Sequence, residues 1–331
     1  MTDFRAIRID KDDGGARAAY VEMREAELME GDVDLDVAFS AINYKDGLAV
    51  TGKAPVVRRF PMIPGIDLAG RVTRSAHADF APGDLVVATG CGVGEAHFGG
   101  FAQKARLSGD WLVKLPPALT PARAMAIGTA GVTAMFCLLA LERHGLTPRD
   151  GDAVVTGASG GVGSFAVALL ARAGWRIAAV TGHPAEADYL KRLGAADILA
   201  RDEFSAPGRL LQTQRFAAGV DTVGGATLVN ILAQTRFDGA IAACGNVAGM
   251  EFAGSVAPFI LRGVSLLGVE SVRPRMALRR AAWARLAQDL DGDAIDAMSE
   301  IVSFDQALER ARAIVTDKIR GRVVIDLGLR L

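Results

Sequence analysis

The chain has 331 residues, of which 50% are hydrophobic and 38 are glycine, and its formal net charge is −1. This length suits two domains with substantial cores, and the composition excludes a disordered or fibrous protein. A net charge so close to zero gives no bulk attraction to nucleic acid or to a membrane surface, so neither is expected as a partner.

The first residues and the cysteines bear on location and metal chemistry. The segment 1–5 lacks the apolar core of a signal peptide, and no uninterrupted apolar run approaches the roughly 18 residues of a membrane span. The three cysteines form neither a disulfide framework nor a CxxC metal pair. A metal shared by Cys91 and His97 would have too few ligands for zinc. We therefore expect a cytoplasmic protein with no metal site.

Residues 1 to about 120 are predicted to be β-rich. Alternating apolar and polar residues over 33–39 predict a half-buried strand, and further strands are predicted at 70–73, 85–88 and 111–114. Turns are indicated at Gly14-Gly15, Gly31-Asp32, Pro64-Gly65 and Pro82-Gly83-Asp84.

After this region the chain alternates between helices and strands. A small-residue helix is predicted over 121–141, with breaks at Gly128 and Gly131. Strands are then predicted at 153–156, 176–180, 197–199, 220–222, 239–244 and 264–269, with helices at 160–173, 185–193 and 227–234. Strands separated by helices indicate a parallel, doubly wound sheet.

A helix over 276–290 leads to a tail that ends in a strand at 321–326. The tail is predicted to complete the β-rich domain, so the doubly wound domain is an insertion within it. Ligands of such a sheet bind at the carboxyl ends of the parallel strands, on the side that faces the other domain.

The most specific motif is the glycine-rich turn Gly157-Ala158-Ser159-Gly160-Gly161-Val162-Gly163, between a strand and an apolar helix. Glycine lets the backbone bend tightly, approach a pyrophosphate and pack a helix against its strand. The helix N-terminus then presents N–H groups and a positive dipole end to the phosphates. The motif predicts a dinucleotide site, and the alternative is a glycine-rich turn without a ligand.

The residues after the second strand bear on which dinucleotide binds. Thr181-Gly182-His183-Pro184 contains no Asp or Glu for the ribose 2′-hydroxyl of NAD. A hydroxyl, an imidazole and small residues could receive a 2′-phosphate. Arg201 lies one strand further on, and its guanidinium suits phosphate because it stays charged and donates in a planar fork. These residues favour NADPH, unless Arg201 belongs to a solvated cluster with Asp202 and Glu203.

Motifs across nearly the whole chain carry a family resemblance. They lie at 43–47, 60–67, 90–95, 109–112, 128–131, 156–163, 221–224 and 258–262. Together they resemble the medium-chain dehydrogenase/reductase superfamily, within it the zinc-free, quinone-oxidoreductase-like branch, and most of all the acryloyl-CoA reductases. The resemblance implies an α/β fold with a GroES-like catalytic domain, 1–121 and 273–331, and an inserted Rossmann domain, 122–272.

Two departures from the wider superfamily bear on the chemistry. Zinc-dependent alcohol dehydrogenases carry Gly-His-Glu where this chain has Gly65-Ile66-Asp67, and the four-cysteine zinc lobe is missing. Polarising a simple carbonyl without a Lewis acid is harder, whereas an activated alkene accepts hydride directly. The resemblance therefore implies zinc-independent, NADPH-dependent reduction of acryloyl-CoA, or another short α,β-unsaturated acyl-CoA, to the saturated thioester, propanoyl-CoA in the first case. Hydride would go to the β-carbon and a proton to the α-carbon.

A third departure concerns the cofactor. The reductase group has an arginine where this chain has His183, while Arg201 keeps the group's pattern. Because an imidazole is partly neutral near neutral pH, binding of the 2′-phosphate is expected to be weaker or pH-sensitive.

The resemblance also suggests roles for individual residues. Tyr44 is the first candidate for contact with the nicotinamide and for the acid that protonates the α-carbon, with water as the alternative acid. Asn43 either orients the thioester carbonyl or caps a turn. Lys45 and Asp46 are expected to pair with each other rather than to act in catalysis. The expected cofactor-binding residues are Tyr44, Thr129, Ser159, Gly160, Gly161, Val162, Thr181, Gly182, His183, Arg201, Val247, Ile260, Ser271 and Lys318.

Two partners are expected besides the cofactor. The phosphates of CoA need cations, for which the candidates are Arg58, Arg59, Arg273, Arg275 and Arg279, although most surface arginines bind nothing specific. The strand at 264–269 is predicted to lie at a sheet edge and to pair across a two-fold axis, which gives a homodimer.

Two alternative functions remain beside the acyl-CoA reductase. One is a quinone or 2-alkenal reductase with the same fold and cofactor. The other is a nucleotide-binding protein without turnover.

Overall fold

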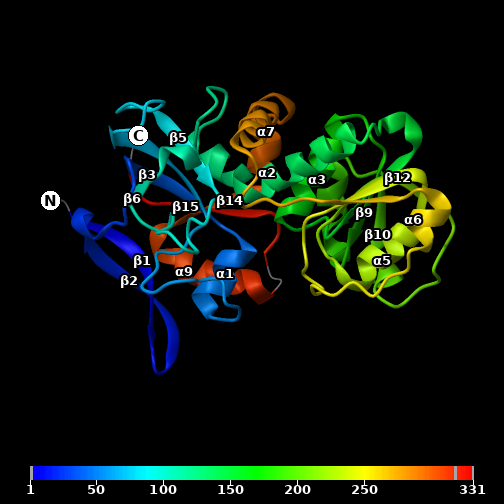
Figure 1. Cartoon of the computed structure of the whole chain (residues 1–331), viewed down its shortest axis with the longest axis horizontal. Helices are drawn as coiled ribbons and strands as arrows, with labels where there is room; N and C mark the ends of the chain where they lie inside the picture. The colour runs from blue at the N-terminus through cyan, green and yellow to red at the C-terminus, as the bar shows by residue number, and fades with distance from the viewer. Residues whose placement is uncertain (1–2, 317–318, 330–331) are drawn as a thin grey trace. The chain divides into compact units, whose positions relative to one another are not determined.

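The computed structural model describes residues 3–316 and 319–329 (Figure 1). The chain forms two compact units. Unit 1 comprises Met1–Thr129, Val272–Ala287 and Ile295–Leu331, and unit 2 comprises Ala130–Ser271 and Gln288–Ala294. The domain boundaries predicted from the sequence stay a prediction.

Unit 1 is the β-rich unit. An antiparallel hairpin of β1 (Asp3–Asp12) and β2 (Gly15–Arg24) turns at the predicted Gly14-Gly15. The main sheet has the order β14-β15-β3-β4-β5-β7, and β6 also pairs with β3. Its strands are β3 (Val33–Ile42), β4 (Asp67–Ser75), β5 (Leu85–Thr89), β6 (Lys104–Leu107), β7 (Leu112–Lys114), β14 (Ser299–Ser303) and β15 (Arg322–Asp326).

The core of unit 1 follows from the alternation of its strands. In β3 the side chains of Val33, Leu35 and Val37 are buried, whereas the intervening aspartates are half-buried, so the predicted strand at 33–39 is confirmed and continues to Ile42. Unit 1 also contains the short helices α1 (Tyr44–Thr51) and α9 (Ala307–Ala313) and most of the longer α7 (Met276–Asp289), whereas α8 (Gly292–Ala297) is divided between the two units. A Cβ on Gly47 would lie 2.6 Å from Ala311 O, so glycine lets α1 pack closely against α9.

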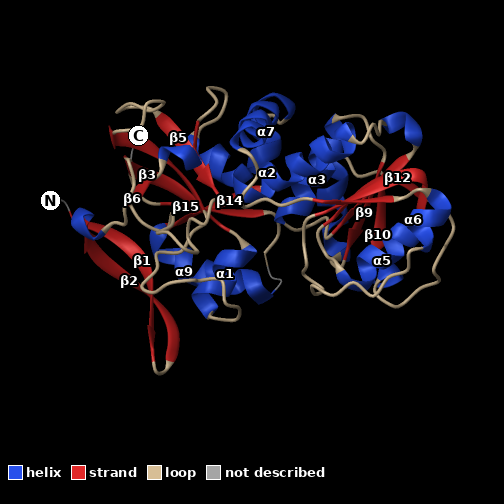
Figure 2. Cartoon of the chain, viewed as in Figure 1, coloured by secondary structure: helices blue, strands red, loops and turns tan. Residues whose placement is uncertain are grey.

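Unit 2 is a parallel sheet with helices between its strands (Figure 2). Its strand order is β10-β9-β8-β11-β12-β13. The predicted alternation of strands and helices is confirmed. The elements are β8 (Asp152–Thr156), α3 (Gly161–Arg172), β9 (Ile177–Thr181), α4 (Ala187–Arg192), β10 (Asp197–Ala200), β11 (Phe216–Asp221), α5 (Gly225–Ala233), β12 (Thr235–Ala243), α6 (Ala257–Arg262) and β13 (Ser265–Gly268).

This order is that of a Rossmann sheet, and it fixes where a ligand binds. The strand order reverses between β8 and β11, and ligands of such sheets bind at the carboxyl ends of the strands beside that point. The glycine-rich turn follows β8 directly. The fold class predicted from the sequence is therefore the one observed.

Helix α2 (Pro121–Arg143) joins the two kinds of architecture along the chain. Its backbone leaves the helical conformation at Gly128, as predicted, whereas Gly131 continues the helix, so the second predicted break is wrong. A helix tolerates an interior glycine at modest cost. The helix is long and apolar enough to cross a membrane, but 83% of its apolar window is buried inside the protein.

Candidate cofactor site and active site

The glycine-rich turn between β8 and α3 requires glycine at two positions. Gly157 has φ +58°, and a Cβ there would lie 2.3 Å from Thr222 Oγ1. A Cβ on Gly163 would lie 2.2 Å from Gly157 O, so only glycine lets the helix approach the turn. A Cβ on Gly160 would be less crowded, because it would meet only Gly157 O, at 3.3 Å. The first N–H groups of α3 have no partner within the helix, as at any helix N-terminus.

Hydrogen bonds join the ends of β8 and β11 beside this turn. Thr156 Oγ1 donates to Asp221 Oδ1 (2.6 Å), and Gly224 N donates to Asp221 Oδ2 (2.8 Å). Thr222 Oγ1 donates in turn to Thr156 O (2.9 Å). Burial raises the pKa of Asp221, and the hydrogen bonds from Thr156 and Gly224 offset part of that rise. The strand ends at the reversal point are therefore held as one rigid edge.

The end of β9 carries the residues expected at a 2′-phosphate. Thr181 Oγ1 lies 3.0 Å from Ser159 Oγ and accepts a hydrogen bond from His183 N (3.0 Å). A Cβ on Gly182 would lie 2.5 Å from Arg201 Cζ, so the guanidinium lies directly against this glycine. The cation of Arg201 thus lies beside the strand end, and His183 follows that end in the chain, which suits a phosphate anion.

The sequence left a solvated cluster with Asp202 and Glu203 as the alternative environment of Arg201, and this alternative stays open because all three residues are exposed. Over residues 3–316 and 319–329, no ion pair joins Arg201 to Asp202 or Glu203, and Glu203 lies instead 3.8 Å from Arg215 Nη1. Arg201 is exposed. The residues around the strand ends therefore fit a phosphorylated dinucleotide.

The other residues expected at the cofactor are scattered over the chain. Val247 and Ile260 are strongly exposed, and Ser271 is half-buried. Lys318 lies outside the described residues. A role for any of these at the cofactor stays a prediction.

The first turn of α1 holds the candidate active-site residues of unit 1. Tyr44 begins the helix and is 45% exposed. Asn43 is its N-cap and is buried. Its amide Nδ2 donates to Asp46 Oδ2 (3.2 Å) and Asp67 Oδ2 (2.9 Å), while its Oδ1 accepts from Arg322 Nη1 (3.0 Å). Both amide hydrogens are thus used within the chain, which favours the capping alternative over contact with a substrate carbonyl.

A buried charge cluster lies beneath this turn. Asp67 and Arg322 are both buried, with Arg322 Nη2 3.5 Å from Asp67 Oδ2. Thr129 donates to Asp67 through its backbone N (2.9 Å) and its hydroxyl (2.5 Å). Burial lowers the pKa of Arg322, and the nearby carboxylates of Asp67 and Asp46 oppose that effect. Sequence reasoning missed this cluster because its members lie far apart in the chain and no local pattern marks them.

The predicted pairing of Lys45 with Asp46 is wrong. Asp46 Oδ1 accepts from the backbone N–H groups of Gly65 (3.2 Å) and Ile66 (3.0 Å), and Lys45 Nζ lies 2.9 Å from Glu95 Oε1. Consecutive helical residues point about 100° apart, so they do not face each other. Burial raises the pKa of Asp46 to about 7, and the hydrogen bond from Asn43 N lowers it in part.

The candidate CoA-binding arginines divide into two groups. Arg58, Arg59, Arg273 and Arg275 are exposed. Arg279 is buried, where its Nη1 donates to Thr89 Oγ1 (2.7 Å) and its Nη2 to Val272 O (3.1 Å). The expectation that Arg279 binds a CoA phosphate is therefore wrong.

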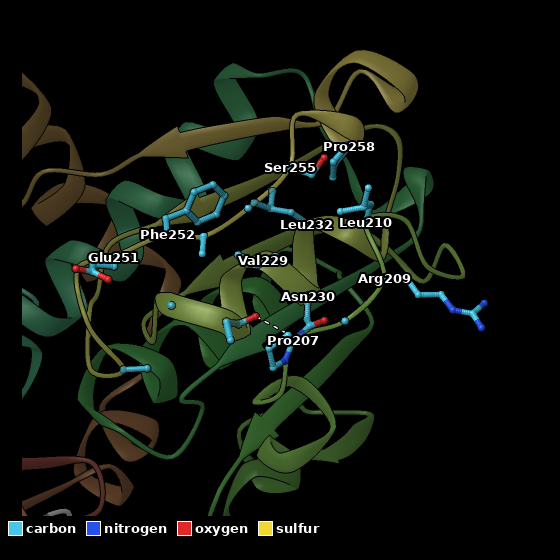
Figure 3. Close-up of a pocket in the computed structure, with 16 residues that line it drawn as sticks. Pro207, Arg209, Leu210, Val229, Asn230, Leu232, Glu251, Phe252, Ser255 and Pro258 are labelled. Carbon is cyan, nitrogen blue, oxygen red and sulfur yellow. Dashed lines mark hydrogen bonds between the residues drawn. The ribbon is translucent and has the colours of Figure 1, made fainter.

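A pocket of about 440 Å³ lies in unit 2 apart from these residues (Figure 3). It is enclosed by the segment 207–210, α5 and the segment 248–258, and none of the residues expected at the cofactor lines it. Arg209 points from its rim into solvent, whereas Asn230 lies at its floor. Across the described part of the chain, no group of three or more His, Cys, Asp or Glu residues could hold a metal ion.

Two family models match the chain. Residues 29–117 match the model described as alcohol dehydrogenase GroES-like domain, and residues 161–288 match the model described as zinc-binding dehydrogenase. These matches correspond to the β-rich part of the chain and to most of its parallel sheet.

Several full-length relatives are similar to the chain. The "Probable acrylyl-CoA reductase AcuI" of Escherichia coli is 47% identical over 98% of this chain and 100% of its own length. The acrylyl-CoA reductase AcuI of Ruegeria pomeroyi is 46% identical over 98% and 99%. The "Putative quinone oxidoreductase YhfP" of Bacillus subtilis is 39% identical over 98% and 99%.

Solved structures show the same fold. The structure of E. coli YhdH with bound NADPH superposes with a TM-score of 0.95 at 47% identity, covering 98% of this chain and 100% of that one. The structure of B. subtilis yhfP with bound NAD also gives 0.95, at 39% identity and the same coverage.

Proposed function

The chain belongs to the medium-chain dehydrogenase/reductase superfamily, in its quinone-oxidoreductase-like branch, and from this premise we propose that it is an NADPH-dependent acryloyl-CoA reductase. It reduces the carbon–carbon double bond of a short α,β-unsaturated acyl-CoA to give the saturated thioester. The observation that carries the proposal is the sequence identity of 46–47%, over nearly the whole chain, to two proteins named acrylyl-CoA reductases.

The geometry of unit 2 supports NADPH as the cofactor. The N-terminus of α3, with Ser159, Gly160, Gly161 and Val162, would hold the pyrophosphate. The strand end at Thr181 and Gly182, flanked by His183 and Arg201, would hold the ribose with its 2′-phosphate. When bound, the cofactor supplies the hydride. The chain itself binds and orients the dinucleotide through a rigid strand edge, which favours a reproducible hydride position.

The residues of unit 1 would act on the substrate. Tyr44, exposed at the start of α1, would donate the proton to the α-carbon, or would order the water that does so. Asn43 and Thr129 would act through their hydrogen bonds to Asp67, which hold the first turn of α1 in place. Val247, Ile260, Ser271 and Lys318 remain candidates for contact with the cofactor.

A quinone or 2-alkenal reductase is the second candidate. The similarity to YhfP favours it, because that relative is also full-length. Both functions use the same cofactor and differ only in the acceptor, so kinetics with several acceptors separate them.

The test is stopped-flow oxidation of NADPH with acryloyl-CoA, crotonoyl-CoA, benzoquinone or buffer alone. We expect fast oxidation with acryloyl-CoA and slower oxidation with the longer thioester. A benzoquinone rate far above the acryloyl-CoA rate would reverse the order of the two candidates. No oxidation with any acceptor would favour a nucleotide-binding protein without turnover.

The assembly is proposed to be a homodimer in the cytoplasm. β13 is the edge strand of the sheet in unit 2, and Leu266 in this strand and Ile260 and Leu261 in α6 are exposed apolar side chains. Pairing of two such edges would satisfy unpaired backbone groups and cover this surface. The thiols of Cys91, Cys137 and Cys244 are unbridged, which suits a reducing compartment. A monomer in sedimentation equilibrium would contradict the dimer.

A further inference from the structure

Lys45 and Glu95 form an ion pair whose presence is not explained by a contribution to the stability of the fold. Lys45 Nζ lies 2.9 Å from Glu95 Oε1, and Glu95 is only 6% exposed. Across the described residues, Lys45 is the one side chain that hydrogen-bonds to this carboxylate. Removal of a carboxylate from water is costly, and a single ion pair compensates for it incompletely, so such a pair is weak support for a fold.

The loop that presents Glu95 has an uncommon backbone. φ is positive at positions 90, 91, 92 and 94, with values of 76°, 56°, 80° and 75°. Cys91 is a non-glycine residue in this conformation, and a Cβ on Gly94 would lie 2.9 Å from the carbonyl carbon of Gly65. Glycine adopts such φ values freely, so the strain in this loop is confined to Cys91, and strain at a non-glycine residue persists only where the surroundings enforce it.

The pair is adjacent in sequence to the proposed acid. Lys45 and Tyr44 occupy consecutive positions in the first turn of α1. Asp46 binds the backbone of Gly65 and Ile66, and Lys45 binds Glu95, so two loops fix the rotation of this turn. The backbone that carries Tyr44 and Lys45 is therefore fixed.

Lys45 also keeps capacity to bind a ligand. An ammonium group has three N–H donors, and Glu95 accepts from it. Within the described ranges no other acceptor contacts Lys45 Nζ, and the side chain is 34% exposed. Glu95 thus fixes the position of the ammonium group, while its other N–H donors remain accessible to a ligand.

We propose that Lys45 is a further catalytic residue, whose ammonium group binds the carbonyl oxygen of the α,β-unsaturated thioester, and that Glu95 is its positioning residue. This inference rests on the proposed function. During reduction a C–H bond forms at the β-carbon, the alkene π pair moves between the α-carbon and the carbonyl carbon, and the carbonyl π pair moves onto oxygen. Protonation of the α-carbon returns that pair to the carbonyl, and NADPH is oxidised. A fixed cation at the oxygen stabilises the charge that develops there.

The test compares Lys45→Met and Glu95→Gln with the wild-type enzyme, and Lys53→Met, an exposed lysine just after α1, is the matched control. We expect Lys45→Met to lower kcat for acryloyl-CoA about 100-fold, the effect of removing one donor from an oxyanion site. Glu95→Gln should lower kcat about 10-fold, because the ammonium remains but is less well placed. Lys53→Met should leave kcat unchanged, and the Kd for NADPH should be unchanged in all three.

The primary kinetic isotope effect shows which step is slowed in the Lys45→Met variant. With NADPH deuterated at the transferred position, the primary isotope effect on kcat should rise in Lys45→Met, because a slower hydride step limits turnover more fully. An unchanged isotope effect together with a weaker Kd for NADPH would contradict the role of Lys45.

A double variant distinguishes catalysis from folding. Lys45→Met leaves a buried carboxylate unpaired and should lower Tm, whereas Lys45→Met combined with Glu95→Gln removes both charges and should recover Tm. Under the proposal the double variant stays slow, and Lys45→Arg recovers part of kcat because it restores the charge. Recovery of kcat in the double variant, or a kcat for Lys45→Met within about threefold of wild type, would overturn the inference. Absence of wild-type turnover with acryloyl-CoA would instead refute the proposed function, and the inference with it.

Discussion

Replacement of Arg201 by alanine should weaken the binding of NADPH far more than the binding of NADH. The guanidinium lies against Gly182 at the end of β9 and is exposed. Two unit charges about 4 Å apart interact by about 4 kcal/mol at an effective dielectric constant of about 20. Salt and exposure reduce this to about 2 kcal/mol, within the range for hydrogen bonds to charged groups. Since about 1.4 kcal/mol is tenfold, we expect a Kd for NADPH about 30-fold higher.

The assay is fluorescence titration of both reduced cofactors into wild type, Arg201→Ala and Arg209→Ala. Arg209 is a suitable control because it is an exposed arginine of the same unit that points into solvent (Figure 3). The Kd for NADH should change by less than about twofold in Arg201→Ala, because NADH has no 2′-phosphate. The difference between cofactors should also shrink at high salt. An equal weakening of both cofactors, or none, would refute a role of Arg201 at the 2′-phosphate.

Three further outcomes are expected. Tyr44→Phe should lower kcat about 100-fold if the phenol is the acid, and an unchanged kcat would assign protonation to water. Arg322→Met leaves Asp67 buried without its cation, so the unfolding free energy in urea should fall by about 3–5 kcal/mol; a loss below about 1 kcal/mol would show that Asn43 and Thr129 suffice to hold that carboxylate. Burial raises the pKa of Asp46 to about 7, above its value in the unfolded chain, so folding favours the protonated form. The unfolding free energy should therefore fall as pH rises from about 4 to about 7, and less so in Asp46→Asn, whereas parallel pH profiles would exclude this titration.

The parallel sheet could be predicted because its signals are local. Short apolar runs, flanked by turn residues and separated by helical stretches, occur in unit 2, and the glycine-rich turn marks where β8 ends. The elements predicted there agree with the observed ones to within a few residues, apart from β11 and β12, which begin four residues earlier than predicted. The strand at 33–39 was equally clear, since Val33, Leu35 and Val37 are buried whereas Asp34 and Asp36 between them are half-buried.

The candidate active site was harder to predict because its contacts are not local. Asp67 meets Arg322 and Thr129 only after β4, β15 and α2 have come together, and the sequence around each residue is ordinary. The prediction that Lys45 pairs with Asp46 was wrong for a different reason. The segment that follows Asn43 is a helix only eight residues long, too short for its periodicity to identify it, and its helical geometry turns the two side chains apart.

The position of β15 has a consequence for synthesis of the protein. This strand follows every strand of unit 2 in the chain, yet it lies between β14 and β3 inside the sheet of unit 1 and supplies the only guanidinium among the described residues that pairs with Asp67. On the ribosome, the strands of unit 2 emerge long before β15 and can assemble early, whereas the sheet of unit 1 keeps a gap until β15 has been synthesised. A nonsense codon just before Arg322 would therefore delete an interior strand of that sheet.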